Sequence, residues 1–204
     1  TAKRSAGAIF WNGHNGTIKY SKFYANKALG IANATSVLGD ITYGGDGGAV
    51  MWSGALGNVI YSNFVNNTAA KRGGAVFLQG SEDEKCDNTT FRSSYFANNV
   101  AGYNGGAIDW YHGARHGIVD NSTFVNNAAK RSGGGIYWSG IDGTIKDSTF
   151  TNNTALGNIT DANGGGDGGA VLWVGQNGII KGSKFKDNRA AYSGGAVFLK
   201  GSDD

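Results

Sequence analysis

Apolar and polar positions alternate in short runs along this chain, and the same runs return throughout its length. One recurring phrase is Ser-x-Phe-x-x-Asn-x-Ala, which occurs six times with unchanged internal spacing. A second block, Gly-Gly-Ala-Val/Ile-x-Trp/Leu-x-Gly or a close variant, alternates with it. Within each run the apolar residues are two positions apart, which is the period of a β-strand. Such self-similarity predicts a solenoid, in which each unit buries its apolar side against its neighbours.

Each repeat predicts three short strands separated by glycine or polar corners, and no run has the length or spacing of a helix. The sequence therefore predicts an all-β parallel β-helix of about six to seven coils, with a rod length of about 30 Å at one strand spacing per coil. Both chain ends match interior repeats. We expect residues 1–204 to form a single β-helix segment of a longer array, with long corner loops at 29–46 and 156–167.

The first strand of each repeat predicts which side faces the core. All five tryptophans occupy one position of this strand, two residues after a Val or Ile position. The position between them carries Asp109, and the opposite orientation would bury this carboxyl while exposing the indoles. We expect the intervening residues to form an outer apolar column. Its members are Phe10, Met51, Phe77, Asp109, Tyr137, Leu172 and Phe198.

The asparagine of the recurring phrase follows the Phe strand and lies at an expected corner. Its amide can bond the equivalent amide of the next coil and also the corner backbone, which no sheet ladder reaches. The sequence therefore predicts a structural ladder. Its members are Asn26, Asn67, Asn99, Asn127, Asn153 and Asn188.

Composition narrows the class of protein. The chain has 36 glycines and no proline, and its 40% apolar content is too high for a disordered protein. A net charge of +3 does not indicate nucleic-acid binding, and no apolar stretch predicts a membrane span. The one cysteine, Cys86, excludes an internal disulfide framework and is expected to be an exposed thiol.

The alternation of Gly-Gly-Ala-Ile/Val with Phe-x-x-Asn resembles the polymorphic outer-membrane protein repeats of chlamydial autotransporters. The longer phrase, which includes Asn-Gly-Thr-Ile, is also similar to adhesin-like surface proteins of methanogenic archaea. The resemblance implies an extracellular, right-handed β-helix with a role in adhesion or surface structure, and it transfers no catalytic residues.

The fourth repeat is the irregular one and contains the candidate site. Its distinctive residues are Asp109, Tyr111, His112, Arg115 and His116. They could form a binding site or an acid–base pair, or they could be solvated charges of a repeat that has drifted. The outer column has three alternatives of its own, which are packing beneath the long loops, lateral self-association and stacking against sugar rings.

Charged residues at the corners suggest weaker hypotheses. Asp40, Asp46, Asp161 and Asp167 could contribute to a Ca²⁺ site, but their spacing fits no known calcium loop and turn chemistry is the favoured explanation. No other cofactor is expected. The pairs at 3–4, 71–72 and 130–131 are Lys-Arg, and they could attract an acidic polymer or remain solvated.

Seven Asn-x-Ser/Thr sequons make glycosylation in a secreted setting an expectation. They begin at Asn15, Asn33, Asn66, Asn88, Asn121, Asn152 and Asn158.

These features favour a non-enzymatic, adhesin-like or structural protein of the cell surface, which acts as a rigid rod and meets other cells, surface glycans or its own copies. One rival is a polysaccharide lyase or hydrolase, because fold alone does not decide function. The other is an extracellular fibre subunit that associates end to end or laterally through unpaired strand edges.

Overall fold

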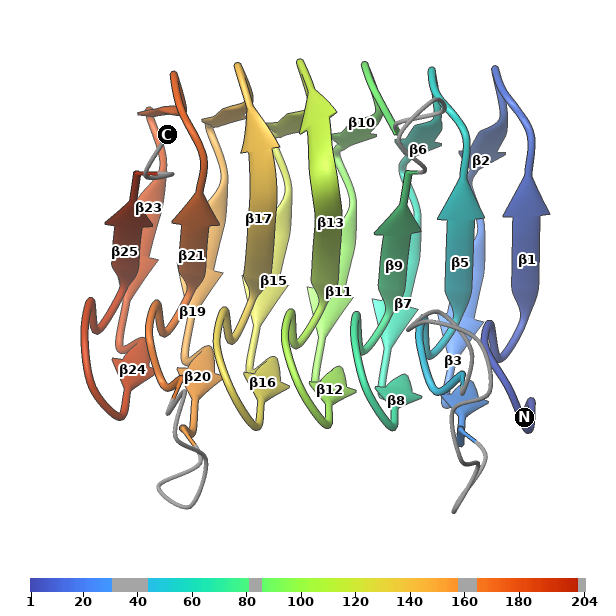
Figure 1. The fold of residues 1–204 in the computed structure, drawn as a ribbon, viewed down its shortest axis with the longest axis horizontal. Coiled ribbons are helices and arrows are strands. Elements are labelled where there is room, and N and C mark those ends of the chain that lie inside the picture. Colours follow the sequence, from blue (N-terminus) through green and yellow to red (C-terminus); the bar gives the residue numbers. More distant parts are fainter. Residues whose placement is uncertain (31–43, 81–85, 158–164, 202–204) are drawn as a thin grey trace.

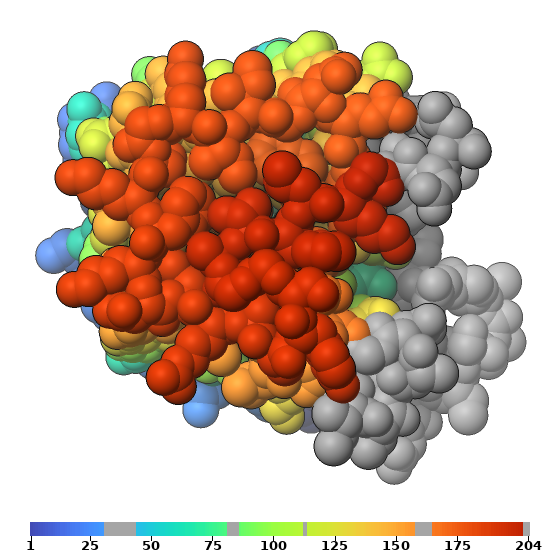
Figure 2. Space-filling view, turned by 90° about the vertical axis from the view of Figure 1, so that its left-hand side faces the viewer, coloured from blue at the N-terminus to red at the C-terminus, as the bar shows by residue number. Residues whose placement is uncertain are grey.

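The computed structural model describes residues 1–30, 44–80, 86–157 and 165–201. The described chain is a rod built from strands and corners, without a helix, and successive coils lie side by side from the N-terminus to the C-terminus (Figure 1). Figure 2 views the rod from its C-terminal end, where the last coil covers most of the earlier ones. Most of the two predicted long loops lies outside the described residues.

Four parallel sheets run along the rod. The first contains β1 (Ile9–Asn12), β5 (Val50–Ser53), β9 (Val76–Gln79), β13 (Ile108–Arg115), β17 (Ile136–Ile141), β21 (Val171–Val174) and β25 (Val197–Lys200). The second contains β2 (Thr17–Lys19), β6 (Asn58–Ile60), β10 (Thr90–Arg92), β14 (Ile118–Asp120), β18 (Thr144–Lys146) and β22 (Ile179–Lys181).

The third sheet contains β3 (Lys22–Tyr24), β7 (Asn63–Val65), β11 (Tyr95–Ala97), β15 (Thr123–Val125), β19 (Thr149–Thr151) and β23 (Lys184–Lys186). The fourth contains β4 (Lys27–Ala28), β8 (Thr68–Ala69), β12 (Val100–Ala101), β16 (Ala128–Ala129), β20 (Thr154–Ala155) and β24 (Arg189–Ala190). The predicted parallel β-helix is confirmed. The prediction of three strands per coil was one too few, because the Asn-x-Ala end of the phrase pairs as a strand of two residues.

Strand pairing is in register, so equivalent residues of successive repeats lie directly beside one another. Trp11 pairs with Trp52, and Phe96 pairs with Phe124. The interior columns predicted from the first strand are confirmed, since Val50 and Trp52 are fully buried. The Phe rings stack face to face, with centroids 4.8 Å apart between Phe96 and Phe124. Stacking of identical apolar columns supplies one continuous core along the rod.

The third coil fills the interior differently from its neighbours. It has Leu78 where the adjacent coils have Trp52 and Trp110. Phe91, in the column that holds Val59 and Val119, packs its ring against the edge of Trp110 at a centroid distance of 5.5 Å.

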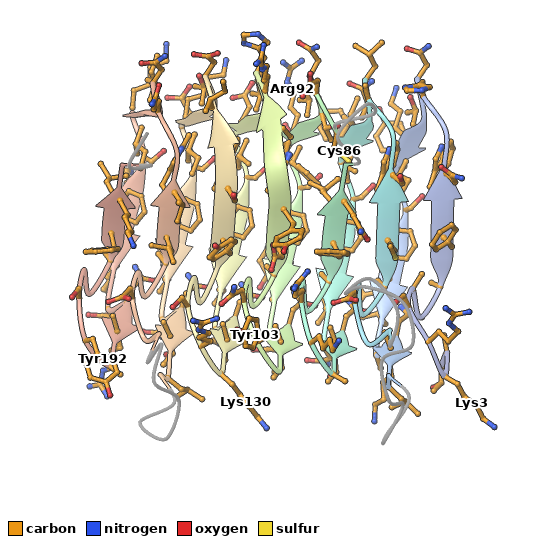
Figure 3. All side chains as sticks on the ribbon, viewed as in Figure 1. Lys3, Cys86, Arg92, Tyr103, Lys130 and Tyr192 are labelled. Atoms are coloured by element: carbon orange, nitrogen blue, oxygen red, sulfur yellow. The ribbon has the colours of Figure 1, made fainter. Side chains whose placement is uncertain are left out.

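Cys86 lies in the same part of the core and is fully buried, so the expectation of an exposed thiol was wrong (Figure 3). Its Sγ donates to the carbonyl of Trp52 at 3.5 Å. Burial raises the pKa of the Cys86 thiol to about 11. The thiol is therefore protonated at neutral pH and packs as a small apolar group in the core.

A glycine accompanies each buried tryptophan. A Cβ at Gly57, Gly117 or Gly143 would lie only 2.5 to 2.8 Å from the indole of its own coil. The equivalent residue in the third coil is Thr89, which is fully buried. Leucine is shorter than tryptophan, so it leaves room there for a side chain.

The corner asparagines form a hydrogen-bonded ladder along the rod. The Nδ2 of Asn127 donates to Asn153 Oδ1 at 2.9 Å and to the Phe96 carbonyl at 3.0 Å. Its Oδ1 accepts from the backbone amide of Asn99 at 3.0 Å and from the Asn99 side chain at 2.9 Å. Each amide thus satisfies corner backbone groups as well as its neighbour.

The serine of the phrase forms a second ladder, which the sequence reasoning did not assign. Ser94 Oγ accepts from the backbone amide of Ser62 at 3.2 Å and donates to the Arg92 carbonyl at 2.9 Å. The invariant spacing of Ser within the phrase was the signal that could have identified this role.

Candidate functional site

The fourth coil departs from the others in strand β13. This strand spans eight residues, whereas β9 spans four. Its register against β17 shifts between Trp110 and Ala114, which marks a bulge. Bulges redirect side chains and are frequent beside functional sites. Tyr111 begins this irregular segment; the side chain of His112 lies outside the described part of the structure.

Asp109 points to the outer side of the first sheet, as its position between two inward residues requires. It pairs in register with Phe77 on one side and Tyr137 on the other. The carboxyl nevertheless has no exposed surface, and within the described chain neither oxygen has a hydrogen-bond partner. Burial raises the pKa of Asp109 well above its usual value; Arg72 opposes this shift and Asp46 adds to it.

Arg72 and Tyr111 enclose the outer side of the sheet beside Asp109. The Arg72 guanidinium lies 4.1 Å from the Tyr111 ring centroid and 5.8 Å from that of Phe77. The Tyr111 and Phe77 rings are tilted, with centroids 6.0 Å apart. This cation–π cluster joins the neighbouring strands β9 and β13, because the corner before β9 carries Arg72 over the sheet.

Two further titratable groups line the same region. The backbone amide of Arg72 donates to Asp46 Oδ1 at 3.3 Å, and burial raises the pKa of Asp46 despite the nearby Arg72 and Lys71 cations. Burial raises the pKa of Tyr137 to about 12, and the charge of Asp109 acts in the same direction. All three shifts favour the neutral form of the buried group over its charged form.

The Lys-Arg pairs are not simply solvated corner charges. Arg131, the arginine of the third pair, lies 4.6 Å from the Tyr103 ring centroid and hydrogen-bonds the Tyr103 hydroxyl. Both arginines are half-buried. Lys3 and Lys130, by contrast, extend from the lower edge of the rod in Figure 3 and are exposed.

The outer column is not one continuous exposed stripe. Phe10 is 60% exposed, whereas Phe77, Asp109 and Leu172 are buried. Met51, Tyr137 and Phe198 are half-buried. The sequence assigned this column correctly to the outer side, but side chains from neighbouring corners cover its centre.

Arg115 and His116 lie at the far end of β13 and are both exposed, so they do not join the buried carboxyl. The Arg115 backbone amide donates to Asp87 Oδ1, and His116 adopts a positive φ of 55° at the corner. The structure thus groups Asp109 with Tyr111, Arg72 and Asp46, of which the sequence reasoning had proposed only Asp109 and Tyr111 for this site.

Among the described residues, no group of three His, Cys, Asp or Glu side chains is arranged to hold a metal. Asp46 and Asp167 bind backbone amides instead, since Asp167 Oδ1 accepts from Ser193 at 3.1 Å, as Asp46 does from Arg72. Asp40 and Asp161, the other residues of the Ca²⁺ hypothesis, lie outside the described residues. Each of these two carboxylates accepts from a backbone amide of the next coil, and the Ca²⁺ hypothesis stays a prediction.

The sequon asparagines in the described ranges share one environment. All are exposed and have positive φ, so each lies at a corner of the coil. They are Asn15, Asn66, Asn88, Asn121 and Asn152. Asn33 and Asn158 lie outside the described residues, and glycosylation stays a prediction.

Comparison with known proteins identifies the repeat. The family model of the Chlamydia polymorphic membrane protein repeat matches residues 61–79, 93–109, 121–137 and 147–172. Four segments of the chain thus match the polymorphic membrane protein repeat. Each match runs from a Ser-x-Phe strand to the following Gly-Gly strand, which is about one coil of the rod. These repeats characterise proteins of the cell surface or outer membrane.

No curated protein and no solved structure gave a significant match to the chain. The predicted similarity of this chain to archaeal adhesin-like proteins therefore stays a prediction. In the described part of the chain, no helix is long and apolar enough to cross a membrane.

Proposed function

We propose that this chain is the rigid rod of a surface protein, which displays its corners and outer faces for adhesion or self-association and does not act as a catalyst. The in-register stacking of all four sheets carries this proposal. Since every coil bonds to the next, side chains far apart in sequence keep fixed separations along the rod. The surface repeat family supports the same role.

Exposed aromatic residues near the N-terminal end offer contact surface. Tyr20 and Tyr61 stack with ring centroids 5.3 Å apart, and they are 69% and 52% exposed. Phe10 is exposed on another side of the same coil. Exposed apolar groups of this kind favour contact with sugar rings, partner surfaces or other copies of the chain.

A polysaccharide-acting enzyme is the second candidate, and the raised pKa of Asp109 favours it because a general acid must be protonated at its working pH. The same residue also argues against it. A carboxyl without exposed surface can protonate a glycosidic oxygen only after the side chains that cover it have moved.

Beads coated with the purified chain test the surface role. We expect saturable binding to intact cells, displaced by soluble chain, or concentration-dependent association in sedimentation. Beads that bind no better than albumin-coated beads, together with a monomer at every concentration, would contradict the proposal. New reducing ends released from a polysaccharide by the wild type, but not by Asp109→Asn, would replace it with the enzyme.

A further inference from the structure

Cations recur at equivalent outer positions of the second, third and fourth sheets. In register, the column of Lys19 continues to Lys181, and the column of Lys22 continues to Lys184. The column of Lys27 continues to Arg189. We call Lys19, Lys22 and Lys27 the first cation belt, and Lys181, Lys184 and Arg189 the second cation belt.

Both cation belts are available to a ligand. All six side chains are exposed. None of them takes part in the ion pairs of the described chain, which use Arg92, Lys146 and Lys186. The side chains project from the flank of the rod, so stacking of coils along its axis leaves them uncovered.

The coils between the belts carry little free charge in the same columns. The second coil has Ile60, Asn63 and Thr68 at these positions. In the fourth coil, Asp120 is held by Arg92 at 3.1 Å and by Lys146 at 3.2 Å. Within these three columns, the positive charge outside ion pairs is therefore concentrated in two bands, about 24 Å apart at five strand spacings.

Each belt crosses the rod roughly at right angles to its axis. Lys19 and Lys27 are eight residues apart along the coil, so a belt extends over at most about 26 Å. A linear polymer with a negative charge on successive units can meet all three cations, whereas a single small anion can meet only one. Tyr20 and Tyr24 stand exposed beside the first belt, where sugar rings can pack on them.

We propose that the two cation belts bind an acidic polysaccharide through its regularly spaced anionic groups. This inference rests on the proposed surface role, because polysaccharides are the charged polymers that a rod outside the cell meets. The first belt, with its two tyrosines, binds such a chain more tightly than the second.

The test measures binding of the purified chain to alginate, which carries carboxylates, and to dextran sulfate, which carries sulfates; neutral dextran serves as the reference. The variant Lys181→Gln/Lys184→Gln/Arg189→Gln is expected to weaken binding to the preferred acidic polymer about tenfold. Neutralising both belts is expected to abolish it. Wild-type binding should weaken as the salt concentration rises.

A matched variant, Lys3→Gln/Arg4→Gln/Lys130→Gln, removes the same charge from exposed corners and should bind within about twofold of wild type. Equal weakening in both variants would show that only net charge matters and would overturn the belts. Failure to bind either acidic polymer, or equally tight binding to duplex DNA, would also overturn them. Polymer binding that survives while bead adhesion to cells fails would leave the belts standing and reject the proposed function.

Discussion

The inner and outer columns of the first sheet belong to the same strands, but their residues are accommodated differently. On the inner side a large Trp is matched by a Gly, and the smaller Leu78 is matched by Thr89. On the outer side Asp109 lies buried between Phe77 and Tyr137 with no hydrogen-bond partner in the described chain. On the inner side, a change in the size of one residue is matched by a change in another residue of the same coil. On the outer side, the buried carboxyl of Asp109 is a destabilising group. A buried polar group without a partner is expected where function competes with stability.

Breaking the inner compensation should have the largest effect. Gly117→Val would place its Cβ 2.5 Å from the Trp110 ring, which is itself stacked on Trp138. We expect a loss of about 3 kcal/mol of unfolding free energy because neither indole can move without opening the stack. Urea unfolding followed by tryptophan fluorescence measures it.

Thr89→Val is the matched control, since it places the same side chain at the equivalent position of the coil that has Leu78. The Thr89 hydroxyl is buried without a partner in the described structure. Its replacement should leave stability unchanged or raise it by about 1 kcal/mol. Equal losses in both variants would show that the Trp–Gly pairing is not what protects the core.

Changing the outer column should have the opposite sign. Asp109→Leu replaces a buried, unpaired carboxyl with an apolar side chain of similar size, and we expect a gain of about 2 kcal/mol at neutral pH. Asp109→Asn should gain less, because its amide remains buried. A loss of stability in Asp109→Leu would show that the carboxyl is compensated after all.

The stability gained by Asp109→Leu should depend on pH. Because the folded-state pKa of Asp109 lies well above its ordinary value of 3.8, the wild type loses stability as pH rises from that value through the raised pKa. Below the ordinary pKa, the carboxyl is protonated in both the folded and unfolded states. The advantage of Asp109→Leu should therefore be smallest in acid and grow towards neutral pH, and a constant difference in unfolding free energy across this range would contradict the pKa direction.

The contrast also explains which features the sequence could predict. Strand alternation is local, so Trp52 and Trp110 could be placed inside and Asp109 outside from the Gly-Gly block alone. The cover over Asp109 could not be predicted, because Arg72 reaches it from the corner before β9 and Tyr111 belongs to the irregular part of β13, where the repeat pattern breaks down. The burial of Cys86 was also missed, because this residue occurs once and belongs to neither repeated motif, so no period could show which way it faces.

The third coil offers the finest test of inner compensation. Leu78→Trp alone should destabilise the rod by about 2 kcal/mol, because Thr89 occupies the place where the other coils have glycine. Adding Thr89→Gly should recover part of that loss, with a coupling energy of about 1 kcal/mol between the two sites. Recovery should stay incomplete because Phe91 and Cys86 also fill this coil. A double-mutant cycle from urea unfolding measures the coupling energy. A reference cycle combines Leu78→Trp with Asn127→Ala, a change at a corner, in place of Thr89→Gly. If the stability changes of Leu78→Trp and Thr89→Gly were strictly additive, the two residues would contribute independently to stability. The idea that each coil matches the sizes of these two residues would then be wrong.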